Sequence, residues 1–233
     1  MKVGLLLTQW KRPYLERQLK AIDAQTLKPD YIIVFQNENH VDISSLKDKY
    51  NFIHVKSDYN TKFFGRFAYF FTLPVDICIV MDDDIVPAVG CIENYVTQCN
   101  EKNAIIGGNG RIGLLNLSRN KLTHPPECGP RRGIKVDFVG HLWCFKKEWL
   151  HYMFGVAPCT YDTGEDMQLC FSAKLNAGIE SYVGAQQKNN GCDSTKNGLA
   201  ADKYASFRTT SSELRKSVEQ YWLDKGLKLI TKN

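Results

Sequence analysis

An apolar run that ends in three consecutive carboxylates is the feature of this sequence that most constrains its fold. The run at 77–81 (ICIVM) contains no polar side chain, and Asp82, Asp83 and Asp84 follow it directly. Such a run indicates a buried strand, of the kind that is covered on both faces in a parallel sheet. The sequence therefore predicts that the three aspartates lie where a central strand ends.

The acidic triplet is expected to bind a cation. Three like charges within a few ångström repel one another and resist ionisation unless a cation or strong donors offset them. On an extended chain Asp82 and Asp84 point to one side and Asp83 to the other. Two carboxylates in this arrangement suit Mg²⁺ or Mn²⁺, which in proteins also holds substrate phosphates. A solvated acidic turn is the alternative explanation.

Strands and helices alternate before this run, which predicts an α/β fold. The expected strands are 3–7, 31–35, 52–55 and 77–81, and the expected helices open at Pro13, near Ser44 to Tyr50, and over 65–73 and 88–99. This order predicts a Rossmann-like, mixed but mostly parallel central sheet with helices on both faces. Ligands bind at the carboxyl ends of the strands in such sheets, which is where the triplet falls.

The second half of the chain is less regular. Strands are expected at 104–108, 135–145 and 179–183, a helix at 163–178 between Thr163 and Gly178, and a last helix that begins with a capping box from Thr210 to Glu213. The polar stretch from Gln186 to Ser206 predicts a mobile loop. We expect one domain over 1–233, with a nucleotide-binding half (1–100), an acceptor half that includes this loop (101–210) and a C-terminal helix (211–233).

A second acidic pair, Glu165 and Asp166, opens the helix expected at 163–178. The helix dipole stabilises carboxylates in the first turn, so capping alone could explain them. The functional interpretation is that one of them acts on a reacting group as a base or stabilises its transition state.

Composition excludes several classes of protein. The chain has 233 residues and a net charge of +5, and its basic residues are dispersed, which does not favour a nucleic-acid partner. No apolar run approaches the roughly 20 residues that a membrane helix needs. A neighbouring domain in a larger multidomain chain is left open.

Several stretches, taken in order, resemble one family. LTQWKRPYLERQLKAIDAQTLKPDYIIVFQNE is similar to the opening strand, helix and strand of exostosin-like glycosyltransferases with the GT-A fold, and GRFAYFFTLPVDICIVMDDDIVP resembles their arginine followed by the metal triplet. VDFVGHLWCFKKEWL resembles their acceptor strand, TGEDMQLCFSAKLNAG their helix with an acidic pair, and GLAADKYASFR their late loop. The resemblance implies a metal-dependent enzyme that moves a sugar from a UDP-sugar to a glycan, glycoprotein or other hydroxyl acceptor.

The resemblance also implies roles for individual residues. Asp82 and Asp84 would hold Mn²⁺ or Mg²⁺ on the diphosphate, and Asp166 or Glu165 would act at the anomeric carbon. The residues implied to bind the nucleotide-sugar are Thr8, Trp10, Arg12, Asn37, Arg66, Asp82, Asp83 and Arg208. Tyr204 stands where the family often has a histidine. The exostosin-like layout favours retention of anomeric configuration; with inversion, Asp166 or Glu165 would be the base.

Two other functions remain open at this point. The letters DDDIV at 82–86 also fit the nucleophile motif of haloacid-dehalogenase-type phosphatases, although these carry it on the earliest strand. A non-catalytic domain that binds a sugar nucleotide is the second alternative. The chain also resembles a viral glycosyltransferase domain that acts on capsid glycans. The expected compartment is the cytoplasm, which for a viral protein would be the cytoplasm of the host cell.

Overall fold

The computed structural model describes residues 1–113, 133–193, 202–204 and 211–230. Its strands are β1 (Val3–Gln9), β2 (Tyr31–Asn37), β3 (Ile53–Ser57), β4 (Ile77–Met81), β5 (Val86–Pro87), β6 (Ile105–Arg111), β7 (Ile134–Val136), β8 (Phe138–Lys146), β9 (Ser181–Val183) and β10 (Cys192–Asp193). Its α-helices are α1 (Leu15–Asp23), α2 (Gly65–Ala68), α3 (Cys91–Lys102), α4 (Leu150–Gly155), α5 (Glu165–Ala177) and α7 (Ser212–Asp224). Short 3₁₀ turns are η1 (Ser44–Leu46), η2 (Tyr69–Thr72) and η4 (Lys147–Trp149).

A mixed, mostly parallel sheet of eight strands organises the molecule. Its order is β3-β2-β1-β4-β8-β6-β9-β7, and β5 pairs with β10 in a separate ribbon. The pairs β3/β2, β2/β1, β1/β4 and β6/β9 are parallel. The pairs β4/β8, β8/β6 and β9/β7 are antiparallel. The expected Rossmann-like α/β fold is thus confirmed, with β4 near the middle of the sheet.

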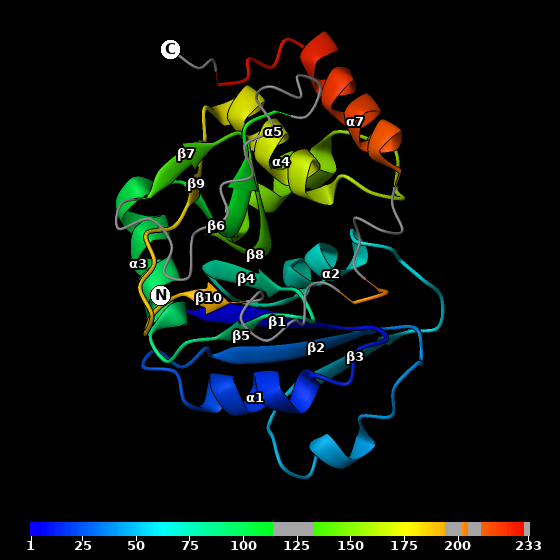
Figure 1. Ribbon diagram of the computed structural model, residues 1–233, viewed down its shortest axis with the longest axis vertical. Helices are drawn as coiled ribbons and strands as arrows, with labels where there is room; N and C mark the ends of the chain where they lie inside the picture. The colour runs from blue at the N-terminus through cyan, green and yellow to red at the C-terminus, as the bar shows by residue number, and fades with distance from the viewer. Residues whose placement is uncertain (114–132, 194–201, 205–210, 231–233) are drawn as a thin grey trace.

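Helices cover both faces of the sheet, as expected. Helix α1 contacts β1, α3 contacts β6 and β8, and α5 contacts β8. Figure 1 shows α1 at the end of the molecule formed by β1, β2 and β3, whereas α4, α5 and α7 gather at the other end. The acidic triplet lies between these two groups of elements.

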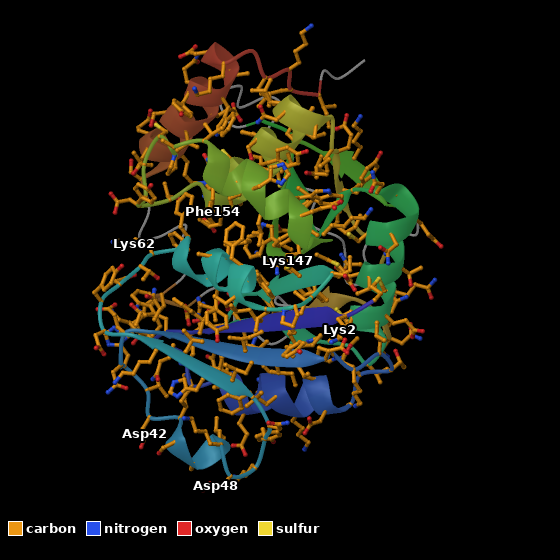
Figure 2. All side chains as sticks on the ribbon, turned by 180° about the vertical axis from the view of Figure 1, so that it is seen from behind. Lys2, Asp42, Asp48, Lys62, Lys147 and Phe154 are labelled. Atoms are coloured by element: carbon orange, nitrogen blue, oxygen red, sulfur yellow. The ribbon has the colours of Figure 1, made fainter. Side chains whose placement is uncertain are left out.

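The buried apolar side chains of the described residues form one continuous cluster. Strand β4 lies at its centre, and all five of its side chains are buried. On the back of the molecule the two ends also meet, because Phe154 of α4 contacts Phe71 of η2 with ring centroids 5.6 Å apart (Figure 2). No helix among the described residues is long and apolar enough to span a bilayer.

Some local expectations were wrong. The helix expected at Ser44 to Tyr50 is only the short turn η1, and the helix expected at 65–73 divides into α2 and η2. The cap expected from Thr163 is absent: Gly164, at φ 85°, precedes α5 without a side-chain cap. The last helix is capped by Ser211, whose hydroxyl accepts from the Leu214 amide, while Thr210 lies outside the described residues. Gly178 does end α5 in the left-handed conformation, as predicted.

Candidate functional site

The acidic triplet forms a turn directly after β4. The chain leaves the strand at Met81, and the amide of Ile85 donates to the carbonyl of Asp82 at 3.2 Å. Because the backbone turns here, the strand alternation expected for the three side chains does not apply. Asp82 contacts Arg66, whereas both Asp83 and Asp84 contact Arg12. The expectation that Asp83 points away from its neighbours is therefore wrong.

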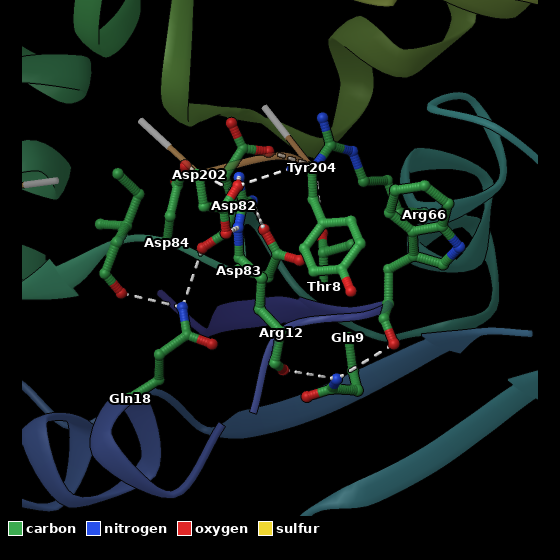
Figure 3. Close-up of polar contacts among 12 residues, drawn as sticks. Thr8, Gln9, Arg12, Gln18, Arg66, Asp82, Asp83, Asp84, Asp202 and Tyr204 are labelled. Atoms are coloured by element: carbon green, nitrogen blue, oxygen red, sulfur yellow. Dashed lines mark hydrogen bonds and ion pairs between the residues drawn. The ribbon is translucent and has the colours of Figure 1, made fainter. Parts of the chain in front are cut away.

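Arg12 is the cation that gathers carboxylates around this turn (Figure 3). Its Nη1 donates to Asp83 Oδ1 and lies 3.5 Å from Asp84 Oδ2. Its Nε and Nη2 make a bidentate pair with Asp202, at 2.7 and 2.8 Å. Burial lowers the pKa of Arg12, but the charges and hydrogen bonds of Asp202, Asp83 and Asp84 outweigh it and hold that pKa above its usual value. Arg12 thus ties the segment 202–204 to the triplet.

Even with Arg12 present, burial makes two carboxyl groups of the triplet harder to ionise. It raises the pKa of Asp83 to about 7, against the opposing effect of Arg12. It also raises the pKa of Asp84 to about 6, and the neighbouring charge of Asp82 adds to the shift. The Oδ1 atom of Asp84 is buried and has no hydrogen-bond partner. A buried carboxylate oxygen without a donor is costly, and a hard cation would satisfy it.

Arg66 links the triplet to the acidic pair on the other side of the site. It is 3% exposed, and its Nη1 donates to Thr8 Oγ1 at 3.0 Å and to Asp82 Oδ1 at 2.5 Å. Its Nη2 donates to Glu165 Oε1 at 3.2 Å. The guanidinium also lies 4.8 Å from the ring centroid of Trp143 in β8. One buried cation therefore connects β1, β4 and α5.

The acidic pair at the start of α5 has two different environments. Burial, with the charge of Asp166, raises the pKa of Glu165 to about 7, although Arg66 and Arg215 oppose the shift. Asp166 Oδ2 accepts from Arg215 Nη2 at 2.6 Å, and its Oδ1 accepts from the Met167 amide. Glu165 is thus a carboxyl group poised near neutral pH, whereas both oxygens of Asp166 are engaged.

Trp10 and Asn37 contact residues other than the acidic triplet. The Trp10 indole donates to Glu38 Oε2 at 3.0 Å, and its ring meets that of Tyr204 edge to face, with centroids 6.2 Å apart. The Asn37 side chain accepts from the amide of Thr61 and donates to Asn60. Asn37 thus holds the loop that follows β3 rather than projecting free groups. Arg208 lies outside the described residues.

The structure brings together most of the residues singled out from the sequence. Hydrogen bonds and ion pairs around the triplet directly connect Thr8, Arg12, Arg66, Asp82, Asp83, Asp84 and Glu165. Sequence reasoning gave no role to Asp202 or to Arg215. Asp202 lies within the stretch GLAADKYASFR, and that was the available signal. Arg215 lies 49 positions from Asp166 in the chain, and no local pattern connects the two.

The described residues contain no group of three or more His, Cys, Asp and Glu side chains arranged to hold a metal ion. Asp82 and Asp84 therefore do not make a complete protein site by themselves. A cation that also binds substrate phosphates needs only one or two carboxylates from the protein, so the donor set at the triplet fits such a cation.

Comparisons with known proteins identify the fold. No protein-family model matches the chain, and no curated protein matches its sequence. Among solved structures, the chain is similar over its whole length to residues 1–349 of TarS from S. aureus in complex with UDP-GlcNAc, with a TM-score of 0.62, 12% identity and 68% of that chain covered. The same fragment with UDP gives a TM-score of 0.58 and 13% identity over 79% of this chain and 58% of that one. Against S. aureus TarS itself the TM-score is 0.57 at 12% identity, covering 97% of this chain and 43% of that one.

These similarities establish the class of fold. At 12–13% identity they show architecture alone, which is a Rossmann-like α/β fold shared with TarS. The chain spans only 58–68% of the 1–349 fragment in its two nucleotide complexes. The similarities therefore show the fold of this chain and not its activity, its donor or its acceptor.

Proposed function

We propose that this protein is a metal-dependent glycosyltransferase that moves a sugar from a UDP-sugar to a hydroxyl group of a glycan or glycoprotein. The observation that supports it most is the buried, unpartnered Oδ1 of Asp84 beside Asp82, at the carboxyl end of a central strand. This is the edge at which α/β folds bind ligands. Two of the TarS structures of similar fold are complexes, one with UDP and one with UDP-GlcNAc.

Asp82 and Asp84 would hold Mn²⁺ or Mg²⁺ together with the diphosphate. The cation would supply positive charge to the nucleoside diphosphate as it leaves. Arg66 lies beside Asp82 and is buried, so it would orient that carboxylate and place a second positive charge at the same point. Arg208, which follows the Asp202 segment in the chain, would cover the pyrophosphate.

The nucleoside would lie on the β1–β2 side of the triplet. Trp10 and Tyr204 present aromatic rings there, which suits a uracil base. Thr8 and Arg12 project from the end of β1 toward the triplet and would border the ribose and phosphates. Asn37 would act through the 60–62 loop that it holds.

The acidic pair would act at the anomeric carbon. With both oxygens engaged, Asp166 suits a fixed negative charge that stabilises a developing oxocarbenium ion, as retention requires. The pKa of Glu165, raised by burial to about 7, suits a base near neutral pH, as inversion requires. The layout favours the first role. The proposed compartment is the cytoplasm. For a viral enzyme that acts on capsid glycans, it would be the cytoplasm of the host.

The test is calorimetric titration of UDP with and without Mn²⁺. We expect metal-dependent binding to the wild type and its loss in Asp84→Asn, because the amide removes a ligand charge. Asp48→Asn is the matched control, since Asp48 is exposed at the far end of the molecule (Figure 2). Failure of UDP to bind in either condition would contradict the proposal, and phosphatase assays would then test the alternative for the triplet.

A further inference from the structure

We propose that Arg111 and Arg215 form an anion-binding subsite beside Asp166, which takes a phosphate or carboxylate group carried by the acceptor. This inference rests on the proposed function and names the class of acceptor. The two arginines are termed the arginine pair below. Neither belongs to the group around the acidic triplet.

Strand pairing places Arg111 at the site. Arg111 is the last residue of β6 and lies opposite Phe138, the first residue of β8, while its carbonyl accepts from the Asp137 amide at 2.9 Å. The guanidinium of Arg215, from α7, lies 5.9 Å from the centroid of the same Phe138 ring. Arg111 is therefore the strand neighbour of the residue over whose ring the Arg215 guanidinium lies, and the two arginines come from elements that are far apart in sequence.

The charges of two guanidinium groups, those of Arg111 and Arg215, act on the carboxylate of Asp166. Arg215 donates to Asp166 Oδ2 and to Thr163 Oγ1, so the single carboxylate of Asp166 is already used by one guanidinium. Arg111 makes no ion pair with any carboxylate in the part of the chain that the structure describes, whereas Arg12, Arg66 and Arg215 each make at least one.

The electrostatics of Arg111 agree with this geometry. Burial lowers its pKa, the nearby charge of Arg215 lowers it further, and Asp166 compensates only in part. Arg111 is half-buried at this position. A guanidinium that has lost part of its hydration and faces another guanidinium is stabilised by an anion, which it can bind through two parallel hydrogen bonds.

The position of β6 assigns this anion to the acceptor. The sheet order is β4-β8-β6, so Arg111 lies two strands across the sheet from the triplet, a lateral shift of about 10 Å at the usual strand spacing. It also lies further along the sheet, because Arg111 pairs with Phe138 whereas the Asp82 amide donates to His141, three residues on. The diphosphate would lie at β4, beside Arg66, which pairs with Asp82 and Glu165, whereas Asp166 pairs with Arg215 of the arginine pair. A group bound at the arginine pair would therefore lie on the Asp166 side of the acidic pair, away from the leaving diphosphate.

The first experiment compares glucose 6-phosphate with glucose as ligands, by calorimetric titration in the presence of saturating UDP and Mn²⁺. We expect glucose 6-phosphate to bind at least tenfold more tightly than glucose to the wild type. Arg111→Gln should remove this difference, and Arg111→Lys should keep part of it, because lysine retains the charge without the planar fork. Arg17→Gln, which removes an exposed arginine from α1, is the matched control and should behave as the wild type.

A second titration separates the possible carriers of the anion. UDP-glucuronate and UDP-glucose are compared on the wild type and on Arg111→Gln. If Arg111→Gln weakens only UDP-glucuronate, the anion belongs to the donor sugar and the inference is overturned. It is also overturned if glucose and glucose 6-phosphate bind the wild type equally, or if Arg111→Gln keeps the phosphate preference.

Failure of the inference is distinguishable from failure of the proposed function. UDP titrated into the wild type tests the donor site independently of any acceptor. If UDP does not bind, the sugar-phosphate comparison is repeated without it. If glucose 6-phosphate then binds more tightly than glucose and Arg111→Gln removes the difference, the result supports an anion-binding site. If there is no such difference, the anion-binding site is overturned. If UDP binds and the phosphate preference is absent, only the acceptor inference fails.

Discussion

A single buried guanidinium, that of Arg66, balances carboxylates from two parts of the chain. It donates to Asp82 after β4 and to Glu165 at the start of α5; Arg66 and Glu165 are buried, and the Asp82 side chain is 27% exposed. Buried charges are tolerated only when they are paired and hydrogen-bonded. The Arg66 guanidinium thus holds these two carboxylates together.

Replacing Arg66 with methionine should destabilise the protein by about 3–5 kcal/mol, because the change leaves Asp82 and Glu165 without their buried cation. Urea denaturation followed by circular dichroism measures the free energy of unfolding. Arg17→Met, at an exposed position of α1, should change it by no more than about 0.5 kcal/mol. A similar small effect of Arg66→Met would show that the carboxylates are already neutral or solvated.

At this scale the sequence predicts which residues lie close together better than it predicts their hydrogen-bond partners. The triplet and the acidic pair were evident because charges next to apolar runs are unusual. The pairing of Asp166 with Arg215 was not evident, because it depends on how α7 crosses α5. The role of Arg12 also differs from a simple ligand contact, since three carboxylates share its guanidinium.

At the scale of elements, helix α5 connects the site to the second half of the chain. Its first turn carries Glu165 and Asp166, and its last turn ends at Gly178, which has φ 66°. A residue with a Cβ is strained at this φ, and space is not the reason, because an added Cβ would meet nothing within 4 Å.

Gly178→Ala should therefore cost about 1–2 kcal/mol of stability through backbone strain alone. Gly155→Ala is the matched control: Gly155 ends α4, an added Cβ also meets nothing within 4 Å there, and its φ is not positive. The control should be neutral or slightly stabilising, since alanine is favoured over glycine in helices. Thermal unfolding of both variants makes the comparison, and equal midpoints would contradict the assigned conformation of Gly178.

Elements buried on both faces were the most predictable from sequence. The run at 77–81 predicts β4 with the bounds that the structure has, because nothing but a central strand suits five consecutive apolar residues in this context. The short helices were less predictable. The stretch at 65–73 changes from α2 to η2 in its middle, and Phe67 and Phe70 on either side of the change both pack on Phe145 of β8, a long-range contact that no local pattern specifies.

At the scale of the whole molecule, the site lies between two groups of elements with different strand directions. Strands β3, β2, β1 and β4 are parallel to one another, and β8 reverses direction beside β4. The site therefore has carboxyl ends of strands on one side and the α5 and α7 helices on the other (Figure 1). The order of strands along the chain predicts the first group, whereas the antiparallel insertion of β8 between β4 and β6 is a long-range pairing that no local pattern specifies.

Three buried acids at this junction should make the stability of the metal-free protein depend on pH. Burial raises the pKa of Asp83 and Glu165 to about 7 and that of Asp84 to about 6, from ordinary values of 3.8 for the aspartates and 4.5 for the glutamate. Between about pH 4 and 7 the folded protein therefore holds protons that the unfolded chain has released. The free energy of unfolding should fall as pH rises through this window.

Mn²⁺ should reverse part of this loss, because a divalent cation stabilises the ionised carboxylates. We expect Mn²⁺ to raise the thermal midpoint more at about pH 7.5 than at about pH 5, where protons compete for the same oxygens. Asp84→Asn should show a smaller dependence on pH without metal and little gain from Mn²⁺, while Asp48→Asn should match the wild type. An equal gain from Mn²⁺ at both pH values, or a metal-free protein that is more stable at pH 7.5 than at pH 5, would show that these carboxyl groups do not carry the charge deficit of the site.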